Sequence, residues 1–90
     1  MGDGSENATV TGRILDVKGL HCPLPILRTR KMLDSMTVGD ELRVEATDPA
    51  SVIDFRHFCN VTDHELLSFR EEDGVFIYLI RRGSISSTDD

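Results

Sequence analysis

The chain has 90 residues, of which 39% are hydrophobic and 29% are charged, and its net charge at pH 7 is −6. This length predicts a single domain of ordinary globular composition. The acidic balance disfavours a protein whose main task is to bind a nucleic-acid backbone, which usually requires a basic surface. No apolar run approaches the ~20 residues of a membrane-spanning helix, and residues 1–11 lack the features of a secretory signal. We therefore expect a cytoplasmic protein.

The first half of the domain predicts a strand, a helix and a second strand. A short strand is expected at residues 13–17. The helix should run from about 23 to 37, because Pro23 and Pro25 both suit a helix's first turn, where a missing N–H costs nothing. Residues 41–47 alternate between apolar and polar side chains, which predicts a half-buried strand.

The second half predicts another helix followed by a hairpin. Asp48 at the cap and a proline at the first helical position indicate a helix over residues 48–59. Strands are expected at residues 64–70 and 75–82, joined by a turn at 71–74 that contains Asp-Gly. The last strand is apolar on both faces, so we place it in the centre of the sheet.

This order predicts an α/β (α+β) two-layer sandwich, βαβαββ, with a mixed four-stranded sheet and both helices on one face. The first two strands should be parallel because a helix crosses between them. The other face would be open, leaving Val75, Ile77 and Leu79 of the last strand partly exposed as a candidate association surface. We expect residues 12–83 to form the domain, between flexible tails at residues 1–11 and 84–90.

The segment "GLHCPLP" at residues 19–25 is the strongest candidate for chemistry. With Pro23 as the first helical residue, Cys22 would be the N-cap, facing unpaired N–H groups and the positive end of the helix dipole. Both would lower the pKa of the thiol and favour the nucleophilic thiolate. Gly19, Pro23 and Pro25 would stiffen the loop, and basic side chains follow in the next turns (Arg28, Arg30, Lys31).

The alternative interpretation of Cys22 is a small buried hydrophobe, since free cysteines are often buried and inert. We apply that interpretation to Cys59, on the apolar face of the second helix. On the first helix, Leu24 and Leu27 fall away from the sheet as a candidate docking surface. The face toward the sheet, which we expect to include Cys22, also holds Ile26, Thr29, Leu33 and Met36. His21 is expected at the surface, His57 and His64 are expected to be surface or cap residues, and no metal site is expected.

These motifs resemble the TusA (SirA-like) family of sulfur-carrier proteins over about residues 15–83. The Gly-Leu-x-Cys-Pro-x-Pro element is the most specific of them. The resemblance rests on "LDVKGLHCPLP" (15–25), "RK" (30–31), "VGDELRV" (38–44), "TDPASVIDFRHFC" (47–59), "HELL" (64–67) and "YLIRRG" (78–83).

The resemblance implies a βαβαββ fold similar to the C-terminal domain of bacterial translation initiation factor three. It implies that Cys22 accepts sulfane sulfur as a persulfide from a cysteine desulfurase and relays it to an acceptor protein. In the best-known branch the sulfur ends in tRNA 2-thiouridine. Arg30, Asp48 and Phe58 are implied near partner contacts. Leu24 stands where the relay proteins often have glutamate, which bears on partner identity more than on chemistry.

Persulfide transfer requires no cofactor, and the free protein is expected to be monomeric, with no membrane or direct nucleic-acid partner. Three alternatives stay open at this point. The fold could serve a non-catalytic regulatory or binding module, or a sulfur carrier for molybdenum-cofactor synthesis or sulfur oxidation. It could also serve a nucleic-acid binder, which rests on fold analogy alone and which the net charge disfavours.

Overall fold

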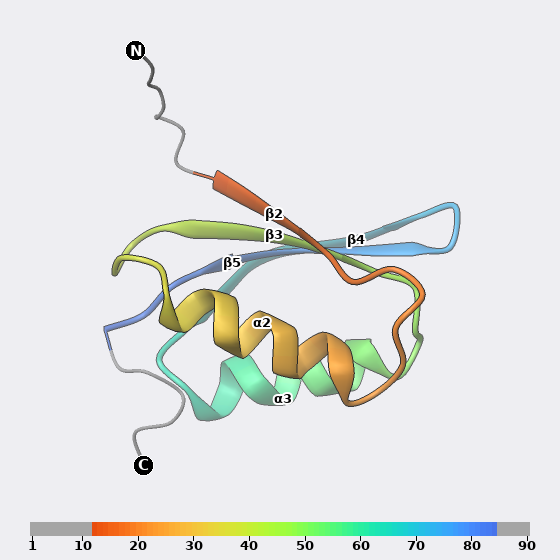
Figure 1. Cartoon of the computed structure of the whole chain (residues 1–90), viewed down its shortest axis with the longest axis horizontal. Coiled ribbons are helices and arrows are strands. Elements are labelled where there is room, and N and C mark those ends of the chain that lie inside the picture. The colour runs from red at the N-terminus through yellow and green to blue at the C-terminus, as the bar shows by residue number, and fades with distance from the viewer. Residues whose placement is uncertain (1–11, 85–90) are drawn as a thin grey trace.

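The computed structural model describes residues 12–84 (Figure 1). The predicted tails lie outside the described residues, except for Ser84, whose N–H and hydroxyl both donate to Asp63 Oδ2, at 3.1 and 2.6 Å. No helix in the described part of the chain is long and apolar enough to cross a membrane. The elements follow the predicted order: β2 (Gly12–Asp16), α2 (Leu24–Asp34), β3 (Glu41–Ala46), α3 (Ser51–Val61), β4 (Glu65–Glu72) and β5 (Val75–Arg81).

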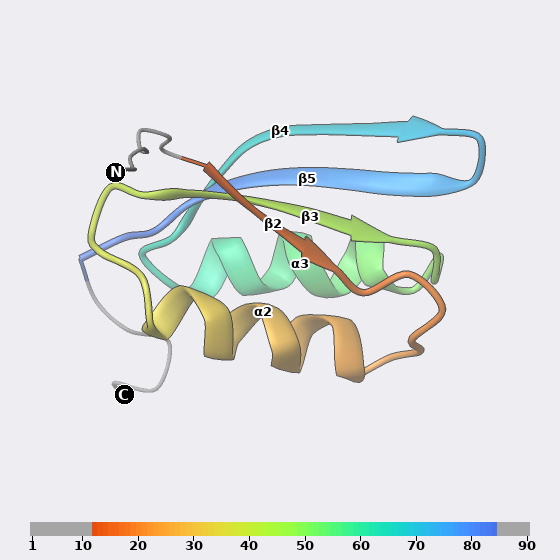
Figure 2. The same cartoon turned by 45° about the horizontal axis from the view of Figure 1, so that its top comes forward.

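The sheet confirms the predicted topology. Its strand order is β2-β3-β5-β4, so the apolar last strand is central. Strands β2 and β3 are parallel, and β5 is antiparallel to both of its neighbours. Both helices cover the same face of the sheet and start at the same end of the molecule (Figures 1 and 2). The right-handed preference of strand–helix–strand connections accounts for helices that share one face.

The core lies between this face and the helices. The pairing of Val44 with Tyr78 puts both side chains under the helices, where they are fully buried. Phe55 of α3 stacks on the Tyr78 ring, with centroids 4.2 Å apart and planes 13° apart. The Tyr78 hydroxyl and the Ser51 hydroxyl lie 2.8 Å apart in a buried hydrogen bond. The Tyr78 ring thus packs on an apolar partner while its buried hydroxyl has a hydrogen-bond partner, as a buried tyrosine requires.

Both helices are shorter than predicted. Helix α2 ends at Asp34 because the N–H groups of Ser35 and Met36 bond carbonyls three residues back, at 3.0 Å each, which tightens the final turn. Helix α3 begins at Ser51, not at Asp48. The Ser51 N–H donates to the Asp48 carbonyl at 2.9 Å, which closes a separate turn ahead of the helix.

The open face of the sheet is less apolar than the sequence suggested. Val75 and Leu79 are half-buried, as expected, but Ile77 is only 8% exposed. Ile77 lies in register with Arg70 on β4, and long charged side chains cover apolar surface with their methylene stems. Ion pairs also cross this face, including Lys18 with Glu45 at 2.9 Å. The face is therefore a mixed charged surface, and its role in association stays a prediction.

The surface or cap role predicted for His64 is wrong. The residue is 2% exposed, and its ring packs against Phe58 with centroids 5.4 Å apart. His64 Nδ1 accepts the N–H of Gly83 at 2.9 Å, while Nε2 is buried without a partner among the described residues. Burial and the charge of Arg82 lower the pKa of His64. The neutral His64 ring therefore links the residues that follow β5 to the start of β4.

We expect this histidine to weaken the fold in mild acid. A folded-state pKa below the unfolded value of about 6.5 means that the unfolded chain binds the proton more readily. The free energy of unfolding should therefore decrease as the pH falls below that value. Urea unfolding at pH 7.5 and 5.5 measures the decrease, and His64→Gln should reduce it. Equal pH dependence in the two proteins would contradict the assignment to His64, because His21 and His57 are common to both.

Candidate functional site

Cys22 lies in the loop that joins β2 to α2 and is exposed to solvent. Because β2 and β3 are parallel, this loop and the loop that leads into α3 leave the same edge of the sheet (Figure 1). Carboxyl ends of neighbouring parallel strands are a common place for functional sites in open α/β sheets. The topology thus brings the 22–25 motif next to the start of α3.

Hydrogen bonds between the two loops hold the cysteine in place. The Gly19 N–H donates to Thr47 Oγ1 at 3.0 Å, at a φ of 86° that favours glycine. The Cys22 N–H donates to Asp48 Oδ2 at 2.6 Å, and Asp48 Oδ1 accepts the Ala50 N–H at 3.1 Å. These two bonds hold the pKa of Asp48 below its usual range. Asp48 is therefore a clamp on the cysteine loop and not, as predicted, the N-cap of α3.

The predicted N-cap position of Cys22 is also wrong. Helix α2 begins at Leu24 with Pro23 as its N-cap, and the Cys22–Pro23 peptide is cis. The Leu24 N–H donates to the His21 carbonyl at 2.8 Å. Pro23 and Pro25 have no N–H, so none of these first positions offers a donor to the sulfur. Cys22 therefore lies outside the helix and does not face the sheet with the buried side of α2.

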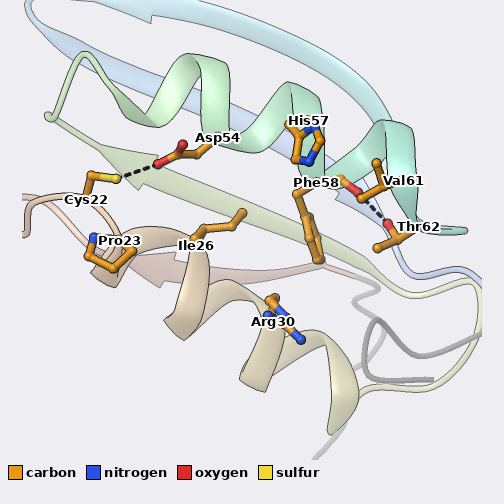
Figure 3. A pocket seen from close by; sticks show the side chains of 9 residues that line it. All are labelled: Cys22, Pro23, Ile26, Arg30, Asp54, His57, Phe58, Val61 and Thr62. Atoms are coloured by element: carbon orange, nitrogen blue, oxygen red, sulfur yellow. Dashed lines mark hydrogen bonds between the residues drawn. The ribbon is translucent and has the colours of Figure 1, made fainter. Parts of the chain in front are cut away.

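The closest charged partner of the thiol is a carboxylate. Cys22 Sγ donates to Asp54 Oδ2 at 2.9 Å, as the dashed line in Figure 3 marks. This hydrogen bond raises the pKa of the Cys22 thiol, and partial desolvation and the charges of Asp54 and Asp48 add to it. The pKa depression predicted from the helix dipole is therefore wrong for the free protein. No local pattern in the sequence indicated Asp54, because it lies 32 positions from Cys22.

A pocket of about 310 Å³ opens beside the sulfur, between α2 and α3. Figure 3 shows Ile26 of α2 and Phe58 of α3 pointing into the space between the helices, with Arg30 further along α2. The structure thus brings Cys22, Arg30 and Phe58 together, and it adds His57. The full lining is Cys22, Pro23, Ile26, Arg30, Asp54, His57, Phe58, Val61 and Thr62.

The other candidate residues lie beside this pocket or away from it. Leu24 and Leu27 are 43% and 47% exposed on α2, which confirms that they point away from the sheet. Cys59 is half-buried and packs against the core, as interpreted from the sequence. Burial raises its pKa to about 11. Of the two thiols, only Cys22 therefore combines exposure with a lined pocket.

Comparison with known proteins gives consistent matches over most of the chain. The family model described as sulfurtransferase TusA matches residues 13–82. The chain is 52% identical over 68 residues to the sulfur carrier protein TusA of Allochromatium vinosum, covering 76% of this chain and 90% of that protein. It is 42% identical over 69 residues to the protein of that name from Pseudomonas putida, covering 77% and 86%. The fold is similar to a SirA-like protein from Desulfitobacterium hafniense, with a TM-score of 0.68, 23% identity and coverage of 79% and 97%.

Proposed function

The chain belongs to the TusA family of sulfur-carrier proteins, and we propose that it carries its sulfur as a persulfide on Cys22. The observation that supports this most directly is the exposed Cys22 thiol at the mouth of an apolar pocket. An exposed thiol lets a donor cysteine approach the sulfur, and a pocket beside it gives the donor's loop a place to bind. Cys59 lacks both features because it is half-buried and packs against the core.

The transfer is a displacement at sulfur. Cys22 Sγ, as thiolate, attacks the terminal sulfur of the donor's cysteine persulfide, and a new S–S bond forms on Cys22. The donor's S–S bond breaks, and its electron pair goes to the sulfur of the donor cysteine. That sulfur takes up the proton released by Cys22 and becomes a thiol. Cys22 sulfur is oxidised by as much as the donor cysteine sulfur is reduced, so no external oxidant is needed. An acceptor cysteine repeats the same displacement on Cys22.

We propose a cysteine desulfurase as the donor and an acceptor protein in the synthesis of tRNA 2-thiouridine as the destination. Arg30 and Phe58 line the pocket beside the thiol, which is where a partner's cysteine loop has to enter. The exposed pair Leu24 and Leu27 extends this surface along α2. Arg28, Arg30 and Lys31 give α2 a positive charge that favours an acidic partner surface.

The loading reaction tests this function directly. The full chain is incubated with a cysteine desulfurase and cysteine that carries labelled sulfur, then separated without reductant. We expect the label on the protein and a mass increase of about 32 Da, one sulfur atom, on the peptide that contains Cys22. A chain that gains neither label nor mass from the desulfurase would overturn the proposal.

The raised pKa of Cys22 favours a second candidate, a non-catalytic regulatory or binding module on the same fold. A thiol that stays protonated is a poor nucleophile, which would suit a protein that only binds partners. This candidate predicts that the desulfurase binds the chain and leaves no sulfur on it. The loading reaction therefore separates the two functions in one measurement.

A further inference from the structure

We propose that Asp54 controls the charge on the sulfur of Cys22. The carboxylate keeps Cys22 of the empty carrier as a thiol, and it weakens the binding of sulfane sulfur to Cys22, so that the sulfur is passed on. This inference rests on the proposed function and names a residue that touches the reacting atom. It is independent of which protein donates or accepts the sulfur.

The geometry places the carboxylate against the sulfur and keeps it there. Asp54 lies in the first turn of α3, half-buried, with Oδ2 2.9 Å from Cys22 Sγ. The Cys22 N–H is fixed by Asp48, which precedes the same helix. Both contacts to the cysteine therefore come from one short stretch of chain, so the bond to Asp48 holds the backbone of Cys22 beside Asp54.

The charged groups around the thiol add more negative than positive charge at close range. The loops contribute Asp48 and the neighbouring His21, and α3 contributes Asp54 and His57. Helix α2 contributes Arg30, which Figure 3 places further along the pocket from the sulfur than Asp54. An anion on Cys22 therefore meets a carboxylate first.

This arrangement discriminates between the two states of the carrier. A thiol donates its proton to Asp54, whereas a thiolate has no proton to donate and is repelled by the carboxylate. A persulfide anion carries its charge on the terminal sulfur, about 2 Å from Sγ, and meets the same repulsion. The empty thiol is thus stabilised and the loaded anion is destabilised, and both effects favour release of sulfur to an acceptor.

The first test titrates the thiol. Asp54→Asn keeps the size and a hydrogen-bond acceptor but removes the charge. We expect Cys22 in this variant to react with iodoacetamide severalfold faster at pH 7, with its pH–rate profile displaced to lower pH, as followed on the Cys22 peptide. Asp73→Asn, in the exposed turn between β4 and β5, removes one charge in the same way and should leave the profile unchanged.

The second test measures how tightly the sulfur is held. Each protein is equilibrated with glutathione and glutathione persulfide at one fixed ratio, and the share of Cys22 persulfide is measured by mass. We expect a severalfold higher share relative to thiol in Asp54→Asn than in the wild type or Asp73→Asn. An unchanged thiol profile, or a persulfide share that is equal or lower, overturns the role of Asp54.

The outcomes for Asp54 and for the proposed function are distinguishable. A wild-type chain that takes no sulfur from the desulfurase overturns the carrier function, and with it the claim about sulfur release. A wild-type chain that loads normally, together with an Asp54→Asn variant that matches Asp73→Asn in both tests, overturns only the inference about Asp54.

Discussion

Replacement of Cys22 by serine is expected to abolish sulfur loading and to leave the fold intact. The side chain is exposed, and the backbone N–H that bonds Asp48 is retained. A serine hydroxyl can donate to Asp54 as the thiol does, but it does not form a persulfide. We expect no 32 Da adduct after incubation with the desulfurase, and a free energy of unfolding within about 0.5 kcal/mol of the wild type, as for most surface changes.

The matched control is the same substitution at the other thiol. Cys59→Ser removes a half-buried thiol, and burial raises the pKa of that thiol to about 11. The variant should therefore load sulfur on Cys22 as the wild type does. Burial of a hydroxyl in place of the thiol should lower stability somewhat, which unfolding measures separately. A labelled adduct that persists in Cys22→Ser, or one that disappears in Cys59→Ser alone, would move the carrier site away from Cys22.

Phe55→Ala should cost about 3–5 kcal/mol of stability, the range for truncating a buried phenylalanine. The ring is fully buried, stacks on Tyr78 at 4.2 Å, and joins α3 to the central strand. Small domains have only about 5–15 kcal/mol in total, so the variant should be near the limit of folding. Because α3 also carries Asp54 and Phe58, we expect the pocket beside Cys22 to be lost with the helix packing.

Urea unfolding measures this cost, and Ile53→Ala is its control. Ile53 lies on the same helix but is 74% exposed, so its truncation should change the free energy of unfolding by less than about 0.5 kcal/mol. Similar costs at the two positions would indicate that α3 is not held by its aromatic contact with the sheet.

Elements whose pattern is local were predicted well. The alternation at residues 41–47 corresponds to β3, and the two-faced apolar run at 75–82 corresponds to the central β5. In β3 burial alternates with a period of two, so neighbours in the sequence indicate the face on which a side chain lies, whereas in β5 apolar residues on both faces indicate a central strand. The parallel pairing of β2 with β3 followed from the helix between them.

Features that depend on distant residues were predicted less well. The role of Asp48 was assigned as a cap because the motif is typical of a helix start, yet its side chain bonds the Cys22 N–H, 26 positions away. His64 is buried because the end of β5 returns over it and Gly83 donates to its ring. In each case a polar side chain bonds a backbone N–H that is distant in the sequence, in addition to any local bond, and no periodicity in the sequence indicates that partner.

The sequence alone predicted Cys22 as the location of the chemistry. A single cysteine between a glycine turn and two prolines is a local motif, so it can be recognised from neighbouring residues without knowledge of the fold. Only the tertiary structure showed which charged group lies next to the thiol of that cysteine. The parallel strands place the start of α3 beside the loop, so the thiol meets the Asp54 carboxylate instead of the first N–H groups of α2. Electrostatic interactions act through space, and their sign at Cys22 was set by a neighbour that the chain order does not reveal.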